Sequence, residues 1–358
     1  MSHAAIVIIL FVVTASASAF AVWRSIPLAH KIGMIDQPGP RRVHQFPIPR
    51  LGGPGIFLAF VIGVTLSFSF DVLRFTSEIE RVALLVAGSA IITLVMLYDD
   101  AVGIAPLPKL LLQTGAAFLV VLPRLRGTGH GIIIDQFNNP FGGEISLPIV
   151  VAIGFTIFWI VGMMNTMNWI DGLDGLAATV TIVACVVLFI HTYFWPKGDP
   201  QFTISLLPLV LGAAVIGFLP FNWYPAKIIM GDSGAMFLGF ALAIISIIGG
   251  AKIATALLAL GLPILDVAWV IVARLASRNS PGRADRGHLH HRLLDLGWSQ
   301  PQVVLFVGGM SLLFGLAGLL LPSRELKLAA IGLIGVLILA TVAAVALRQR
   351  DEKNGRPI

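Results

Sequence analysis

The sequence is poor in charged residues and almost free of cysteine. Asp, Glu, Lys and Arg together make up 12% of the 358 residues, whereas 57% are hydrophobic and the mean hydropathy is +0.92. This composition excludes a soluble globular protein of this length and indicates a polytopic membrane protein. The single cysteine, Cys185, lies inside an apolar run, which excludes an intrachain disulfide and disfavours a cysteine-based metal site.

Long apolar runs follow one another along the whole chain. Several are shorter than the ~20 residues that an upright helix needs to span a bilayer, so some helices are expected to be short or kinked. The pattern predicts an all-α membrane protein with about eleven spanning helices, forming one integral-membrane domain over residues 1–350 with a cytoplasmic tail at 351–358. The runs lie near residues 4–23, 51–70, 82–98, 109–122, 149–165, 176–194, 204–220, 235–250, 253–273, 302–321 and 328–347.

The first run has some features of a secretory signal. Small residues at 15–19 look like a cleavage region, but no Lys or Arg precedes the run and Arg24 follows it. This charge order is the reverse of a secretory signal, so we expect an uncleaved anchor with a periplasmic N-terminus.

Basic residues are divided unequally between the loops. With the N-terminus outside, sixteen of the 24 Lys and Arg residues fall in inner loops, which satisfies the positive-inside rule and places the C-terminus in the cytoplasm. The net charge of +6 does not indicate nucleic-acid binding, because its carriers are spread over many short loops.

The fifth run ends in a polar motif, here called the Asn/Asp motif: Asn165, Asn168, Asp171 and Asp174. Residues three apart share a helical face, although the glycines at 172 and 175 are expected to break the helix. Such groups are costly in hydrocarbon, which favours a functional site over a simple polar helix end. Carboxylate and amide oxygens beside a phosphate are the ligands that Mg²⁺ uses.

Three further acids and one lysine lie at the inner ends of other runs. Asp99 and Asp100 would point about 100° apart on a helix, so we expect them to do different jobs. Lys109 is placed to reach phosphate oxygens, with interfacial snorkelling as the alternative. Asp232, at the start of the eighth run, is either a metal ligand or a helix N-cap.

Two inner loops are rich in cationic side chains. Arg42 and His44, with Arg41 and Arg50, lie among prolines and glycines that predict a compact, non-helical path over residues 24–52. They are suited to an anionic headgroup or serve only as topogenic charges.

The second loop carries Arg283, Arg286, His288, His290 and His291, which favours a multiply charged anionic substrate. Zinc is the rival ligand there, disfavoured by the neighbouring arginines and the lack of cysteine.

One acid, Asp266, lies within a predicted span. An ionisable residue at that depth is a functional candidate by default, and we favour a structural hydrogen-bonding role for it.

Four of these motifs, taken in order, give a recognisable pattern. Asp99-Asp100 followed by Lys109, the Asn/Asp motif, Gly231-Asp232-Ser-Gly234 and His288-x-His290-His291 resemble the polyprenyl-phosphate N-acetylhexosamine-1-phosphate transferase family, in glycosyltransferase family 4. The resemblance covers roughly residues 30–300 and is closer to the bacterial branch that starts O-antigen, enterobacterial common antigen or wall teichoic acid than to the lipid I branch.

The resemblance implies a reaction and a location. A sugar 1-phosphate would pass from a UDP-N-acetylhexosamine to undecaprenyl phosphate, releasing UMP, at the cytoplasmic face of the bacterial inner membrane. The expected partners are these two substrates and the lipid bilayer, with a homodimer as one alternative.

The resemblance also implies roles for single residues. Asn168 and Asp232 would bind Mg²⁺, for which Mn²⁺ is an expected substitute, and Lys109 would contact phosphate. Asp99 or Asp100 would engage the lipid phosphate or act as a base. Asp171 and Asp174 would shape or polarise the site, and Asn165 with the cationic loop residues would bind substrate.

Two other functions compete with this interpretation. An intramembrane prenyltransferase also uses Asp and Mg²⁺, but it would leave the His/Arg loop without a role. A secondary transporter predicts ionisable residues near the midplane and often an internal repeat, whereas here they gather at one face.

Overall fold

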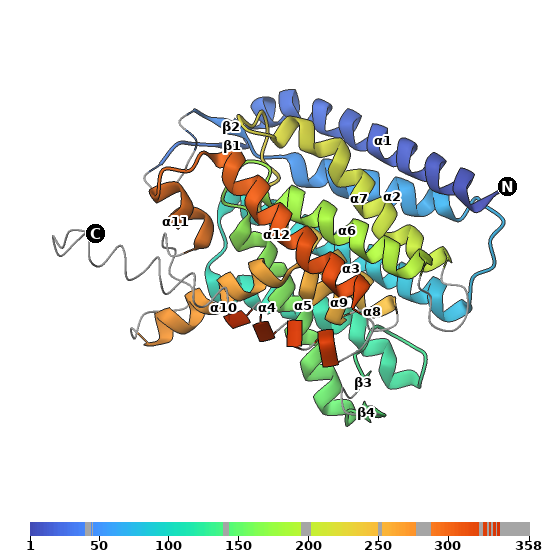
Figure 1. Cartoon of the computed structure of the whole chain (residues 1–358). Helices are drawn as coiled ribbons and strands as arrows, with labels where there is room; N and C mark the ends of the chain where they lie inside the picture. The colour runs from blue at the N-terminus through green and yellow to red at the C-terminus, as the bar shows by residue number, and fades with distance from the viewer. Residues whose placement is uncertain are drawn as a thin grey trace.

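The computed structural model describes residues 1–39, 44, 46–138, 143–194, 202–249, 253–276 and 288–321, with short pieces between 325 and 336. Over these residues the chain forms a helical bundle with two short strand pairs and one 3-10 turn, η1 (Leu122–Arg126) (Figure 1). The helices are α1 (His3–Ile32), α2 (Gly52–Ser67), α3 (Thr76–Val102), α4 (Pro106–Val121), α5 (Ile149–Ile170), α6 (Leu176–Phe194), α7 (Phe202–Asn222), α8 (Gly231–Ile248), α9 (Ile253–Ala259), α10 (Gly261–Ala276), α11 (Leu289–Asp295) and α12 (Gln300–Leu320).

The strand pairs are antiparallel. β1 (Ile35–Asp36) pairs with β2 (Ile48–Pro49) between α1 and α2. β3 (Gln136–Asn138) pairs with β4 (Glu144–Ser146) in the loop before α5.

The centre of the bundle is α8. Every residue of this helix except Asp232 is buried, because α2, α3, α5, α6, α7 and α9 all pack around it. A helix that is apolar on all sides is stable only in such surroundings. The start of α8 is therefore fixed relative to several other helices.

The membrane-protein prediction agrees with this architecture, while the count of eleven spans stays a prediction. Eight described helices are long and apolar enough to cross a membrane, or nine if α9 and α10, bent by 78°, form one broken span. The apolar helix α2, at 16 residues, is shorter. Most of the run predicted at 328–347 lies outside the described residues, as does the tail at 351–358.

The prediction of a non-helical path over residues 24–52 was wrong for its first part. α1 continues to Ile32 with Pro27 inside it and ends at Gly33, whose φ of 77° is left-handed. The helix therefore carries the chain directly to β1, and the N-terminus and the β1–β2 pair lie at opposite ends of α1 (Figure 1).

The first turn of α2 is clamped against the start of α8. Gly52 and Gly53 donate backbone hydrogen bonds to the carbonyls of Ile229 (3.1 Å) and Met230 (3.0 Å). A Cβ at Gly53 would overlap the backbone of Gly234, and one at Gly234 would lie 2.8 Å from Cα of Gly53. Glycine at both positions permits this approach.

We expect Gly53→Ala to separate α2 from α8 and to cost about 1–3 kcal/mol of stability through overpacking. Thermal unfolding in detergent measures the loss. Gly115→Ala in α4 is the matched control, because nothing lies within 4 Å of a Cβ there. Equal unfolding temperatures for the two variants would contradict the expectation.

Candidate active site

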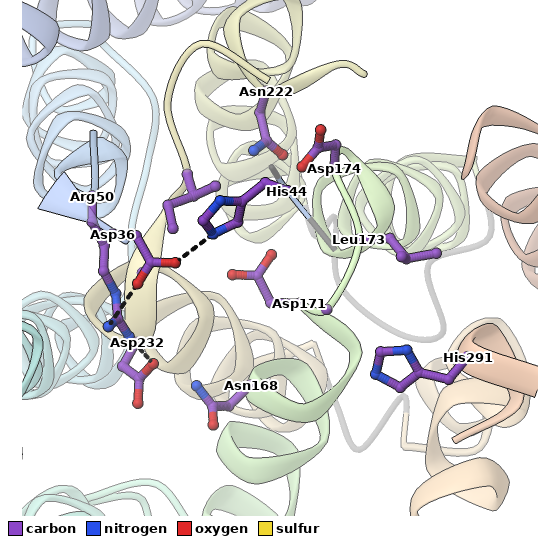
Figure 2. A pocket seen from close by; sticks show the side chains of 13 residues that line it. Asp36, His44, Arg50, Asn168, Asp171, Leu173, Asp174, Asn222, Asp232 and His291 are labelled. Atoms are coloured by element: carbon purple, nitrogen blue, oxygen red, sulfur yellow. Dashed lines mark hydrogen bonds and ion pairs between the residues drawn. The ribbon is translucent and has the colours of Figure 1, made fainter. Parts of the chain in front are cut away.

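A polar cavity of ≈ 180 Å³ lies at the end of the bundle that carries β1 and β2 (Figure 1), and Figure 2 shows the side chains that line it. Its walls come from the β1–β2 segment, the α5–α6 loop, the end of α7, the start of α8 and α11. The cavity brings together six of the predicted site residues: His44, Asn168, Asp171, Asp174, Asp232 and His291. An adjoining cavity of ≈ 450 Å³ shares His44 and Asp174 with it.

The Asn/Asp motif reaches this cavity because α5 ends at Ile170 and α6 begins at Leu176. Gly175 turns the chain with a φ of 78° and donates its N–H to the side chain of Asn222 (3.0 Å). The Asp174 carboxylate accepts the backbone N–H of Ala226 (2.9 Å). Asp171 therefore sits on a glycine-flanked turn, as predicted.

Asp232 stands in the first turn of α8 and makes ion pairs with two cations. Its Oδ2 contacts Nζ of Lys109, and its Oδ1 lies 2.7 Å from Nη2 of Arg50. Lys109 also pairs with Asp99 at 2.6 Å. Helix α8 starts at Gly231, and its N-cap residue is Met230, so the prediction that Asp232 is an N-cap was wrong.

The two adjacent acids do different jobs, as their spacing predicted. Asp100 has a fully buried side chain and accepts the backbone N–H groups of Asp232 (2.9 Å) and Ser233 (3.0 Å). It thus caps α8 from another helix and pairs with Arg50 at 2.8 Å. Asp99 binds Lys109 and the N–H of Ile104 (2.5 Å) instead.

Asn165 does not line either cavity. Its amide donates to Oε1 of Gln113 (2.8 Å) and to the carbonyl of Val161 (2.8 Å), so it links α5 to α4. Its predicted contact with substrate stays a prediction, as do those of Arg42, Arg283 and Arg286, which lie outside the described residues.

The His motif is fixed by the acid within α10. Asp266 accepts the N–H of Leu289 (2.7 Å) and pairs with Nδ1 of His288 (2.9 Å), the structural role favoured for it. His290 is buried and directs Nε2 at Gly172, where a Cβ would lie only 2.6 Å away. His291 then faces the cavity.

Two residues of the cavity wall, Asp36 and Asn222, were not predicted as site residues. Asp36 binds Nε2 of His44 (2.7 Å) and lies 3.7 Å from Arg50, forming the linked group drawn in Figure 2. Asn222 holds both the α5–α6 turn and, through the carbonyl of Ile228 (3.0 Å), the loop before α8. A polar residue at the end of an apolar run was the available signal for Asn222.

The chain is similar to known proteins over most of its length. A glycosyl transferase family 4 model matches residues 82–250. The chain is 31% identical, over 91% of its length and 88% of the relative, to a probable undecaprenyl-phosphate N-acetylglucosaminyl 1-phosphate transferase of Bacillus subtilis (strain 168). The chain belongs to this family. Relatives in this family are named as N-acetylglucosamine phosphotransferases that act on undecaprenyl phosphate or decaprenyl phosphate.

Two further relatives show the range of the family. The transferase is 32% identical to the decaprenyl-phosphate N-acetylglucosaminephosphotransferase of Mycobacterium tuberculosis (strain ATCC 25618 / H37Rv), over 78% of this chain and 74% of the relative. It is 29% identical to the phospho-N-acetylmuramoyl-pentapeptide-transferase of Staphylococcus saprophyticus, over 80% and 88%. These relatives give no support to the prenyltransferase or transporter alternatives.

The side-chain oxygen atoms that line the cavity are of the kind that binds a divalent cation together with a substrate phosphate. Asp232, Asn168 and Asp171 offer oxygen atoms to one cavity. No three His, Cys, Asp or Glu side chains among the described residues are grouped to hold an ion by themselves. Mg²⁺ commonly takes one or two protein carboxylates and completes its shell with water and phosphate oxygens, which fits this set.

The electrostatics of the loop residues follow from burial and from the crowded carboxylates. Burial and the neighbouring Asp232 raise the pKa of Asp171 well above its ordinary value, and burial raises the pKa of Asp174. Burial and the adjacent His291 and His288 lower the pKa of His290 well below its usual range, so this imidazole is neutral.

We expect Asp171→Asn to stabilise the transferase at pH 7. The folded protein holds the Asp171 proton more tightly than the unfolded chain, so wild-type stability falls as the pH rises from the ordinary pKa of 3.8 through the raised folded value. The variant lacks this cost, and its advantage in unfolding temperature should disappear toward pH 4. Asp135→Asn in the loop before α5 is the control, and an advantage independent of pH would contradict the assignment.

Proposed function

We propose that the protein transfers a sugar 1-phosphate from a UDP-N-acetylhexosamine, GlcNAc or a related sugar, to undecaprenyl phosphate. The products are UMP and a polyprenyl diphosphate-sugar that initiates O-antigen or another cell-envelope polysaccharide. The protein acts as a multi-pass enzyme of the bacterial inner membrane, with its site at the cytoplasmic face. The names of its relatives support a polyprenyl phosphate as the acceptor.

One observation carries the proposal: carboxylate, amide and cationic groups converge on a single cavity. Asp232 and Asn168 line this cavity and would supply oxygen ligands for a cation, while Arg50 lies on the same wall and Lys109 contacts Asp232 from α4. Phosphoryl transfer requires positioning and charge neutralisation more than covalent assistance from the protein. The adjoining cavity gives room for the remainder of a nucleotide sugar.

The chemistry is a single displacement. An oxygen of the lipid phosphate attacks the β-phosphorus of the UDP-sugar, the bond from that phosphorus to the bridging oxygen breaks, and UMP leaves with the electron pair. The lipid phosphate is already an anion near neutral pH, so no base is required to create the nucleophile. Both oxygens of Asp100 are hydrogen-bonded and its side chain is buried, which argues against a covalent aspartyl-phosphate.

Mg²⁺, or Mn²⁺ in its place, would be held by Asp232 and Asn168 and would neutralise charge on the diphosphate. Asp171 would polarise the same wall, and Asp174 would fix the loop before α8 through Ala226. Lys109 would contact phosphate. His288 would support His290 and His291 beside the substrate.

The test is to incubate purified protein with undecaprenyl phosphate and a panel of UDP-sugars. We expect release of UMP and a lipid product of matching mass for at least one N-acetylhexosamine. EDTA should abolish turnover, and Mg²⁺ or Mn²⁺ should restore it. No turnover across the panel, with protein that remains folded, would overturn the proposed function.

Substitution of the proposed cation ligands should remove activity without unfolding the protein. We expect Asp232→Asn and Asn168→Ala each to reduce kcat by about 10²-fold or more, because each removes an oxygen that positions the cation on the diphosphate. UMP release and thermal unfolding are measured together. Asp135→Asn, in an ion pair with Arg124 in the loop before α5, should keep wild-type kinetics. Near-normal turnover in either site variant would remove that residue from the cation site.

A further inference from the structure

Arg50 is fixed at its backbone on both sides. Its N–H donates to the carbonyl of Met34 (2.9 Å), and the preceding carbonyl of Pro49 accepts the N–H of Ile229 (2.9 Å). The glycines that follow it are clamped on the start of α8. Any movement of Arg50 is therefore confined to its side chain. Arg50 is one of the residues that line the cavity.

The guanidinium group uses only part of its donor capacity. Nη2 contacts both Asp100 (2.8 Å) and Asp232 (2.7 Å), whereas Nη1 is 3.7 Å from Asp36. Nε is buried and has no hydrogen-bond partner among the described residues. A guanidinium has five N–H donors in a planar fork that matches phosphate oxygens. With 20% of its side chain exposed, Arg50 is accessible from the cavity.

Arg50 differs from the other described residues of the cavity wall in its positive charge. Among the described residues that line the cavity, it is the only Lys or Arg, and it faces Asp36, Asp171 and Asp232. These acids would repel a diphosphate in this cavity unless a positively charged group bound the diphosphate. Burial alone would lower the pKa of Arg50, but the acids outweigh burial and raise it, so Arg50 stays charged.

We propose that Arg50 is a further substrate-binding residue: it is the counter-ion of Asp232 in the unloaded site and binds the diphosphate oxygens of the nucleotide sugar once a divalent cation occupies Asp232. This rests on the proposed function for the identity of the diphosphate. The exchange moves one side chain between two anions and conserves the charge of the cavity. Asp36, held by His44, steadies the guanidinium from the other side, as a positioning residue.

The first test is cation binding without substrate, using Mg²⁺ alone and thermal unfolding. Removing the Arg50 guanidinium leaves the charge of Asp232 less neutralised. Arg50→Met should therefore be less stable than wild type without Mg²⁺, and its unfolding temperature should rise more than that of wild type when Mg²⁺ is added. We expect the Mg²⁺ concentration for half of the shift to fall about tenfold. Arg74→Met is the matched control, because Arg74 pairs with Glu78 at the far end of α2 and should be destabilised with no change in the Mg²⁺ response.

The second test is kinetic. Arg50→Met should raise the KM for the UDP-sugar about tenfold to a hundredfold, the loss of one or two charge-assisted hydrogen bonds. Arg50→Lys keeps the charge but lacks the fork, so it should fold, keep a Mg²⁺ response near that of wild type and still show a raised KM. This variant carries the test if Arg50→Met does not fold.

The outcomes separate the two proposals. An unchanged or weaker Mg²⁺ response in Arg50→Met, or a KM for both variants within about threefold of wild type, would overturn the role of Arg50. A purely structural arginine would lower stability equally with and without Mg²⁺. If wild-type protein itself showed no turnover, the proposed function would fail, while the Mg²⁺ response would still decide whether Arg50 is the counter-ion of Asp232.

Discussion

The ion pairs of Asp232 are the interaction on which the rest of the site depends. This carboxylate lies between Lys109 from α4 and Arg50 from the segment before α2. A partly buried charge is tolerated only when it is paired and its other partners are satisfied. Pairing Asp232 therefore requires that Lys109 and Arg50, from two other chain segments, both reach the start of α8. The site is assembled by this requirement as much as by the packing of apolar helices.

The buried surroundings of α8 make that requirement strict. Its first N–H groups have no partners within the helix, and water has little access to them. Asp100 supplies the missing acceptors from α3, which explains why one acid of the pair is fully buried while Asp99 takes Lys109. The Asp pair, Lys109 and the start of α8 thus form one bonded framework. Asp266 repeats the device at α11, where it accepts the N–H of Leu289 and orients His288.

Hydropathy predicted most of the helices, because membrane helices are selected for length and apolarity. It could not place the end of α1, since Pro27 and the basic residues near it resemble a loop while the helix continues to Ile32. Most of the Asn/Asp motif was placed correctly in one cavity with Asp232 and His291, because polar groups that end apolar runs are costly unless they face water or a ligand. Asn165, in contrast, turns to Gln113. The three-residue spacing of the Asn/Asp motif predicts that its residues share one face of a helix, but it does not predict which neighbouring helix packs against that face. Asn222 was missed because Gly175, which it binds, comes from a distant segment. Asp36 was missed because only the pairing of β1 with β2 brings it beside His44 and Arg50.

Charge balance also bears on how substrates enter. Near the cavity, Asp36, Asp99, Asp100, Asp171 and Asp232 face only Arg50 and Lys109 among the described Lys and Arg residues. A free diphosphate would approach this excess of carboxylates unfavourably, and a free cation would have to compete with two resident cations for Asp232. A divalent cation already bound to a diphosphate carries positive and negative charge together. As it enters, the cation can pair with Asp232 while the diphosphate pairs with the Arg50 and Lys109 side chains that Asp232 releases. Under the proposed function, and because unpaired charge is costly in a site of low dielectric, this favours entry of the nucleotide sugar together with its divalent cation.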